Sequence, residues 1–163
     1  MESSDYGLPI VVLTVLVVDD RSMARRIASR ILSEEGFRVL EADGMGEALE
    51  VLAQARGRVD LVMLDVVLAD GDGVKLARQI QEEWPSQRIL FMSGFAAEVL
   101  TRYGLRDLDV PFLAKPFTRG ELLAKVAEAI DRPTAQTSRT RPATDREQQS
   151  EPEQDKTPGA GQE

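Results

Sequence analysis

The 163-residue sequence predicts an α/β protein in which an open, doubly wound parallel sheet carries helices on both faces. Three observations predict this class. Short apolar segments recur along the chain, their residues do not alternate with polar ones, and segments with helical periodicity separate them. Strands that are covered on both faces have such continuous apolar runs. Right-handed connections between parallel strands then place helices on both sides of the sheet.

Five strands are expected. Four of them are continuous apolar runs, and the segment at 38–42 is weaker. In chain order the expected strands cover residues 15–18, 38–42, 61–64, 89–92 and 112–114. A helical pattern follows each strand, so the order is strand–helix repeated five times, which is typical of an open parallel sheet.

Five helices are expected to follow these strands. They cover residues 22–35, 46–55, 74–84 and 96–103, and the last runs from Thr118 through Ile130. Gly36 and Gly57 follow the first two helices, since glycine accepts the left-handed conformation that commonly ends a helix. Pro85 stops the third helix. Thr118 is the expected N-cap of the last helix, and Glu121, three residues later, completes a capping box.

The sequence divides into an N-terminal extension at 1–12, a folded domain at 13–131 and a polar, acidic tail at 132–163. The tail contains no Val, Leu, Ile, Met, Phe, Trp or Tyr. We expect it to be disordered, because it cannot offset the backbone entropy lost on ordering, about 1–2 kcal/mol per residue. The apolar run at 8–18 is shorter than the roughly 20 residues that span a bilayer. No basic residue precedes it, unlike in a secretory signal, so we expect a cytoplasmic protein without a membrane partner.

Composition excludes several classes of chemistry. The chain has no cysteine and no histidine, which excludes disulfides, thiolate metal sites, Ser-His-Asp catalysis, histidine-bound zinc and a phosphohistidine of its own. Its formal net charge is −8, whereas proteins that bind nucleic acid neutralise phosphates with clustered Lys and Arg. We therefore expect no direct contact with nucleic acid.

Chemically active side chains follow four of the expected strands. The first strand ends in Asp19 and Asp20, the third in Asp65, the fourth in Ser93 and the fifth in Lys115. In open α/β sheets ligands bind at the carboxyl ends of the strands, so these groups should meet at one edge. Any one of them alone would be an ordinary cap or turn residue. Together they need a compensating cation, because two carboxylates about 4 Å apart repel by roughly 4 kcal/mol at an effective dielectric near 20.

The residue types indicate which cation and which chemistry. Oxygen donors without imidazole or thiolate suit Mg²⁺, Mn²⁺ or Ca²⁺ rather than zinc. A Mg²⁺ ion held by few carboxylates is usually completed by water and by phosphate oxygens. Without His or Cys, a carboxylate is the most available nucleophile, which would form an aspartyl phosphate. Lys115 could then neutralise phosphoryl oxygens, and the Ser93 hydroxyl could donate to one.

This constellation resembles the CheY-like receiver domain of two-component response regulators. The matching motifs are VLVVDD, LVMLDVVLADGDG, ILFMSG and FLAKPF, and the resemblance covers about residues 13–131. It implies a flavodoxin-like (βα)5 fold with strand order 2-1-3-4-5 and phosphorylation of Asp65. It also implies that Mg²⁺ is held by Asp20, Asp65 and the backbone carbonyl of Val67, with Asp19 acting mainly through water.

The resemblance also implies a switch. Ser93 and Lys115 fall at the positions that contact the phosphoryl group, and Phe112 falls at the aromatic position whose ring turns inward. Here that aromatic is Phe rather than Tyr, so it forms no phenolic hydrogen bond. The family often has proline where this chain has Ala69, so the loop at 69–73 is expected to be a more mobile turn. That loop lacks the length and the terminal Glu of an EF-hand.

The function implied is that of a phosphoprotein in a phosphorelay, not of an enzyme with a separate substrate. A partner histidine kinase or histidine phosphotransfer protein would donate the phosphoryl group. A downstream protein would bind the surface of the fourth helix, fifth strand and fifth helix. A free-standing regulator and the terminal receiver of a hybrid kinase both fit the sequence.

Three other classes are weighed against this function. An aspartate-nucleophile phosphatase would place its nucleophile after the first strand with a second Asp two residues later, and would need a substrate cap. A flavin- or nucleotide-binding module would need a phosphate-cradling loop where Asp19-Asp20 would repel the ligand. A scaffold that is not phosphorylated, a pseudo-receiver, stays open as the alternative, although such domains usually lose one of the key residues.

Overall fold

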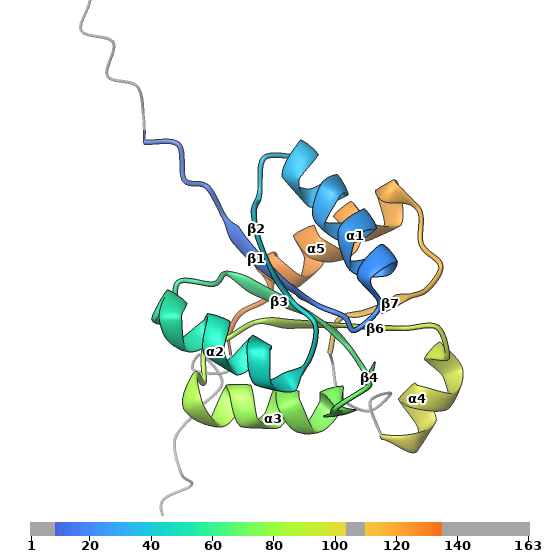
Figure 1. Ribbon diagram of the computed structural model, residues 1–163. Coiled ribbons are helices and arrows are strands. Elements are labelled where there is room, and N and C mark those ends of the chain that lie inside the picture. The colour runs from blue at the N-terminus through green and yellow to red at the C-terminus, as the bar shows by residue number, and fades with distance from the viewer. Residues whose placement is uncertain (1–8, 104–109, 135–163) are drawn as a thin grey trace, which may run out of the picture.

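The computed structural model describes residues 9–103 and 110–134 (Figure 1). In chain order the elements are β1 (Thr14–Val18), α1 (Ser22–Glu34), β2 (Arg38–Ala42), α2 (Met45–Ala55), β3 (Leu61–Asp65), β4 (Val67–Leu68), β5 (Gly71–Asp72), α3 (Gly73–Glu83), β6 (Ile89–Ser93), α4 (Ala96–Arg102), β7 (Phe112–Ala114) and α5 (Arg119–Asp131). The predicted α/β class is confirmed. The predicted tail lies outside the described residues beyond Thr134.

Five strands form one parallel sheet in the order β2-β1-β3-β6-β7. This is the expected 2-1-3-4-5 order, because β6 and β7 are the fourth and fifth strands of that sheet. Helices α1 and α5 lie on one side of the sheet, and α2, α3 and α4 lie on the other (Figure 1). The register places Val18 beside Leu64, and Ser93 beside Ala114, so the carboxyl ends of the strands lie at one edge.

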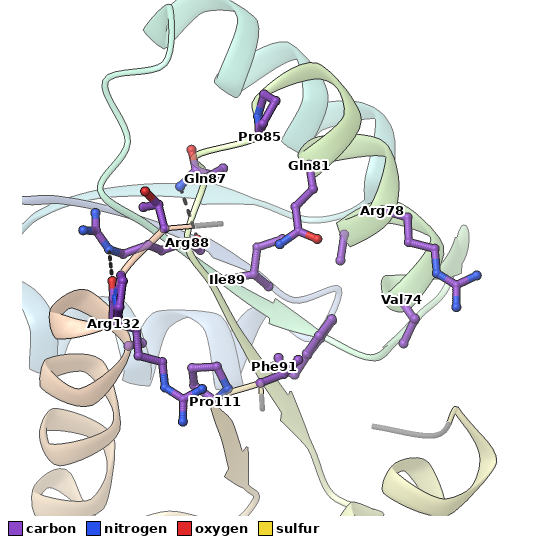
Figure 2. Close-up of a pocket in the computed structure, with 15 residues that line it drawn as sticks. Val74, Arg78, Gln81, Pro85, Gln87, Arg88, Ile89, Phe91, Pro111 and Arg132 are labelled. Atoms are coloured by element: carbon purple, nitrogen blue, oxygen red, sulfur yellow. Dashed lines mark hydrogen bonds between the residues drawn. The ribbon is translucent and has the colours of Figure 1, made fainter. Parts of the chain in front are cut away.

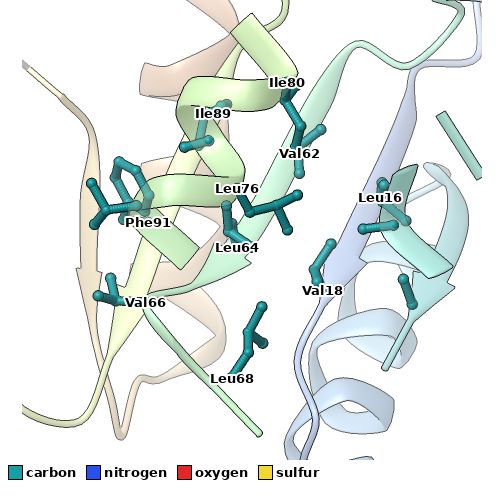
Figure 3. Close-up of a cluster of buried hydrophobic side chains, with 14 of the residues drawn as sticks. Leu16, Val18, Val62, Leu64, Val66, Leu68, Leu76, Ile80, Ile89 and Phe91 are labelled. Atoms are coloured by element: carbon teal, nitrogen blue, oxygen red, sulfur yellow. The ribbon is translucent and has the colours of Figure 1, made fainter. Parts of the chain in front are cut away.

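The sheet is covered on both faces, which explains why its strands do not alternate. In β1, Leu16 and Val18 point into the core under α2 and α3, whereas Val15 and Val17 point into the core under α1 and α5. All four side chains are fully buried. Figure 3 shows the first of these cores. Burial of one such aliphatic side chain contributes about 1.5–3 kcal/mol, so the two cores fix the sheet that presents the site.

The turn expected at 69–73 is shorter in the structure: it covers residues 69–70 and forms the tip of a hairpin. Val67–Leu68 and Gly71–Asp72 pair as a short antiparallel hairpin. Its two aspartates cap two helices: the Asp72 carboxylate accepts from the Val74 backbone N–H at 2.8 Å, and Asp70 accepts from the Met45 backbone N–H at 2.8 Å. Strand prediction missed the hairpin because each arm has only two residues and relies on the contacts made by these aspartates.

The observed helix ends agree with the predicted helix boundaries within one or two residues. The capping box at the start of α5 is confirmed, since Thr118 and Glu121 exchange side-chain-to-backbone hydrogen bonds. Gly36 and Gly57 have the positive φ angles, 91° and 73°, that the sequence predicts after the first two helices. Within the described residues, no helix has the length and apolar content that crossing a bilayer requires.

Candidate functional site

Three carboxylates lie together at the carboxyl edge of the sheet. Asp19 follows β1, Asp20 is next to it, and Asp65 ends β3. One oxygen from each lies within 4.8 Å of the other two. Asp19 and Asp65 are only 1% and 7% exposed, whereas Asp20 is half-buried. The sequence predicted this convergence, and the parallel register produces it.

Lys115 joins two of the carboxylates. Its Nζ donates to Asp65 Oδ2 at 2.7 Å and also to Asp19 Oδ2. Pairing of β6 with β7 brings the lysine there, because the Lys115 backbone N–H donates to the Ser93 carbonyl at 2.9 Å, directly after β7 ends. The lysine side chain is mostly buried, which shields both ion pairs from water. Shielded pairs are screened less by salt than exposed ones.

The backbone fixes the other oxygen of each buried carboxylate. Asp19 Oδ1 accepts from the Arg21 N–H at 2.9 Å, and Asp65 Oδ1 accepts from the Val67 N–H at 2.9 Å. Each carboxylate therefore has one oxygen held by the backbone and one facing Lys115. The Arg25 guanidinium also donates to the Asp19 carbonyl at 2.6 Å. This arginine was not predicted; its only sequence signal is its place in the first turn of the following helix.

Gly73 allows the site to be this compact. It begins α3, and a Cβ atom at this position would lie 2.1 Å from the Asp65 carbonyl oxygen. The Gly73 N–H also donates to the Val66 carbonyl at 2.8 Å, which ties the helix to the end of β3. Any larger residue would push α3 away from the strand that carries Asp65.

Ser93 ends β6 at the carboxyl edge of the sheet, whereas Phe112 begins β7. No hydrogen bond joins Ser93 to the three carboxylates among the described residues. The Ser93 side chain is buried, and its Oγ accepts from the Phe95 N–H at 3.1 Å. Phe112 is half-buried on β7 opposite Phe91, against the core under α4. Ser93 therefore lies at the predicted edge, and the roles of Ser93 and Phe112 in a switch stay predictions.

The Asp72 carboxylate also reaches α4. Its hydrogen bond to the Tyr103 hydroxyl is the main cause that raises the pKa of that phenol, followed by burial. Asp72 also caps α3, so this carboxylate acts both on the start of α3 and on the residue that follows α4. Sequence analysis did not foresee it, since Tyr103 is distant in the chain and carries no motif.

The donor set fits a hard divalent cation. Three carboxylates face one ammonium group, so this lysine leaves two negative charges uncompensated. All side-chain donors are oxygens, which suits Mg²⁺. The fourth predicted ligand, the Val67 carbonyl, belongs to β4, which begins two residues after Asp65, and its role as a ligand stays a prediction.

A separate cavity of about 290 Å³ lies between α3, the start of β6 and the end of α5 (Figure 2). None of the predicted site residues lines it. Its floor includes Ile89, Phe91 and Pro111, and Arg88 donates to the Arg132 carbonyl at its rim. This cavity is thus distinct from the carboxylate cluster.

Comparison with known proteins agrees with this geometry. Residues 15–127 match the response regulator receiver domain family. The chain is 35% identical over 119 residues to the sensor kinase CckA of Brucella abortus, covering 73% of this chain and 13% of that protein. It is 29% identical over 116 residues to the response regulator receiver protein CpdR of the same organism, covering 71% and 95%. The chain spans about half (54%) of a third relative, the regulator KdpE of Escherichia coli.

Solved structures give the same result. A receiver domain protein from Methanospirillum hungatei superposes with a TM-score of 0.66 at 25% identity, covering 74% of this chain and 95% of that one. The receiver domain of the hybrid histidine kinase CckA gives 0.61 at 28%, covering 72% and 99%. The CheX–CheY–BeF3–Mg²⁺ complex from Borrelia burgdorferi gives 0.66 at 26%, covering 74% and 90%. This chain belongs to the response regulator receiver domain family.

Proposed function

We propose that the chain accepts a phosphoryl group on Asp65 from a phosphohistidine of a partner histidine kinase or phosphotransfer protein. The observation that carries the proposal is the position of Lys115, whose ammonium group bridges Asp65 and Asp19 in a mostly buried site. A structural ion pair would need one carboxylate. Asp20 adds a third carboxylate at the same place, which supports a site that binds additional cationic and anionic groups.

The nucleophile in this proposal is Asp65 Oδ2. The Val67 N–H holds Oδ1, so Oδ2 is the oxygen that faces Lys115. Attack forms a P–O bond and breaks the P–N bond of the donor, whose imidazole departs as the leaving group. Lys115 then shifts from the carboxylate to the phosphoryl oxygens. Positioning and charge compensation supply the catalysis, as in other phosphoryl transfers.

Asp19, Asp20, Asp65 and the Val67 carbonyl are the groups that would hold Mg²⁺. When bound, the ion neutralises charge on the transferring phosphoryl group. Its presence in the similar CheY complex from Borrelia burgdorferi supports the assignment. Because the acceptor is the chain's own carboxylate, the protein acts as a phosphorylated switch and not as an enzyme with a separate substrate.

Apolar side chains around the site offer a surface for the donor. Met23 and Ile27 on α1, Val67 after Asp65 and Phe95 after Ser93 are 75%, 51%, 58% and 62% exposed. Apart from the segment at 10–12, no other large apolar side chain is that exposed in the described part of the chain. Exposed apolar groups gathered at one place typically mark a protein contact. The partner's histidine-bearing element would cover them in the cytoplasm while it delivers the phosphoryl group.

The switch would begin at Ser93. Its Oγ leaves the Phe95 N–H and donates to the new phosphoryl oxygens, and Phe112 repacks into the space that opens. The surface of α4, β7 and α5, where a downstream protein would bind, changes as a consequence. Conversion of a mostly inactive population to a mostly active one requires a difference of about 5 kcal/mol between the two states.

Intact mass after incubation with acetyl phosphate tests the proposal. Wild type should gain one phosphoryl group only with Mg²⁺, and Asp65→Asn should gain none. Asp131→Asn is the matched control, because this aspartate ends α5 away from the carboxylate cluster. It should label like wild type. No label on wild type, under conditions that label an established receiver, would favour a pseudo-receiver scaffold.

A further inference from the structure

A second group of charges lies at the opposite edge of the sheet. Arg38 begins β2, and Arg56 and Arg58 follow α2; all three are exposed and line a cavity of about 400 Å³. The side chains of Gln54 and Thr14 complete its polar wall. In a chain of net charge −8, three guanidinium groups around one cavity are an unusual local excess of positive charge.

Among the described residues these guanidinium groups have no acceptor. Within residues 9–103 and 110–134, no carboxylate or carbonyl accepts a hydrogen bond from the side chains of Arg38, Arg56 or Arg58. The carboxylate nearest in sequence belongs to Asp60, and the Thr14 N–H occupies its Oδ2 at 2.7 Å. The cavity is therefore suited to an anion with several acceptor oxygens, since guanidinium binds carboxylate and phosphate with paired hydrogen bonds.

The last described residue, Thr134, lines a second cavity that is linked to this one through the chain at 56–58. Thr134 shares a neighbouring cavity with Gly57 and Asp60, and Gly57 lies between Arg56 and Arg58 in the chain. Residues 135–163 continue from that point. A flexible spacer chain of twelve residues, the number at 135–146, would span about 20 Å, which is long enough for the residues that follow to reach the arginines.

The segment beyond the spacer has the complementary charge. Residues 147–155 contain no basic residue and carry four carboxylates, those of Glu147, Glu151, Glu153 and Asp155. We propose that Arg38, Arg56 and Arg58 form an anion-binding site and that this acidic segment of the same chain occupies it. The tether gives the segment an effective concentration in the millimolar range, so weak ion pairs are enough to populate the contact.

The contact is electrostatic, which makes it sensitive to salt. Exposed charges interact over about 30 Å at 0.01 M ionic strength but over only about 3 Å at 1 M. The acidic segment has almost no apolar side chains to add a salt-independent contribution. Docking should therefore be lost at high salt while the folded domain persists.

Paramagnetic relaxation in the full chain tests this proposal. The chain has no cysteine, so Ser150→Cys carries a single spin label in the acidic segment. We expect selective broadening of the backbone amides at 38–40 and 54–58 at low salt, about 0.02 M, and at least a fivefold smaller effect at about 0.5 M. The amides around Asp65 should not respond.

Two charge variants test whether the three arginines cause the broadening. Neutralising the site with R38Q/R56Q/R58Q should remove the broadening. R21Q/R26Q/K75Q removes the same charge from exposed positions elsewhere and should preserve it. Broadening that survives in the first variant, or that is absent from wild type, would overturn the proposal. Inorganic phosphate that binds these amides equally well with and without E147Q/E151Q/E153Q/D155N would show a site for free phosphate, and would overturn the tail as its occupant.

Discussion

The two ends of the sheet use charge in opposite ways. At the carboxyl end, Asp19, Asp65 and Lys115 are buried, and each forms hydrogen bonds of fixed geometry. At the amino end, Arg38 and Arg56 are exposed and have no acceptor among the described residues. Buried charges are costly unless they are paired, so a buried cluster must be built accurately. The charges of the carboxyl end thus lie in fixed short-range contacts, whereas those of the amino end are open to solvent.

The largest expected effect tests whether the carboxyl end of the sheet is packed more tightly than the amino end. Gly73→Ala should destabilise the fold by about 3 kcal/mol, because its Cβ would meet the Asp65 carbonyl at 2.1 Å and α3 would have to move. At the amino end, Gly57→Ala should cost only about 1–2 kcal/mol, for its φ of 73° alone, since the nearest atom would be 3.8 Å away.

Urea denaturation measures both effects. Gly46→Ala is the control, because it lies within α2 with open space around the added methyl group. It should be neutral or stabilising by up to about 1 kcal/mol. Equal losses at Gly73 and Gly57 would mean that the carboxyl end is no more tightly packed than the amino end.

The second prediction concerns the ammonium group of Lys115, the cation of the carboxylate cluster. Lys115→Met should slow labelling by acetyl phosphate roughly 100-fold, because no ammonium group then compensates charge on the phosphoryl oxygens. Lys125→Met is the matched control, since Lys125 forms an exposed ion pair with Glu128 on α5. Its labelling rate should equal that of wild type. A change below about threefold for Lys115→Met would remove this lysine from the transfer step.

The sequence predicted the sheet, its order and the convergence of Asp19, Asp20, Asp65, Ser93 and Lys115. This succeeded because continuous apolar runs report burial on both faces, and the strand ends of a parallel sheet share one edge. Prediction from the sequence failed where the structure depends on contacts between residues that are distant in the chain.

The hairpin at 67–72 is the clearest failure. Its arms are too short for a periodic signal, and Asp70 contacts the start of α2, 25 residues away in the chain, only after the chain has folded. The same reason hid the interaction of Tyr103 with Asp72. The contact of Arg25 with the Asp19 carbonyl spans only six residues, but no motif marks it. Local pattern thus identified which groups meet at the site, whereas the packing that holds them in place came only from the structure.

The smallest expected effect comes from an exposed ion pair, which sharpens the contrast with Lys115. Arg119 and Glu34 join α5 to α1, with Nη1 2.7 Å from Oε2, and both side chains are nearly half exposed. The Arg119 guanidinium is the main cause that holds the pKa of Glu34 below 4.5, and Arg30 adds to it. Because the pKa of Glu34 is lower in the folded state, the ion pair stabilises the fold at pH values above the unfolded-state pKa. This stabilisation is lost as the pH falls through the folded-state pKa.

Glu34→Gln should therefore lower the urea midpoint slightly at about pH 7, and the difference from wild type should vanish as pH falls below about 4. Glu50→Gln on α2 is the control and should show no such convergence. The difference at neutral pH should also shrink in high salt, since the pair is open to solvent. A salt-independent difference would mean that Glu34 acts through packing of α1 against α5. A difference in burial would then not explain why this exposed ion pair and the buried ion pairs of Lys115 behave differently.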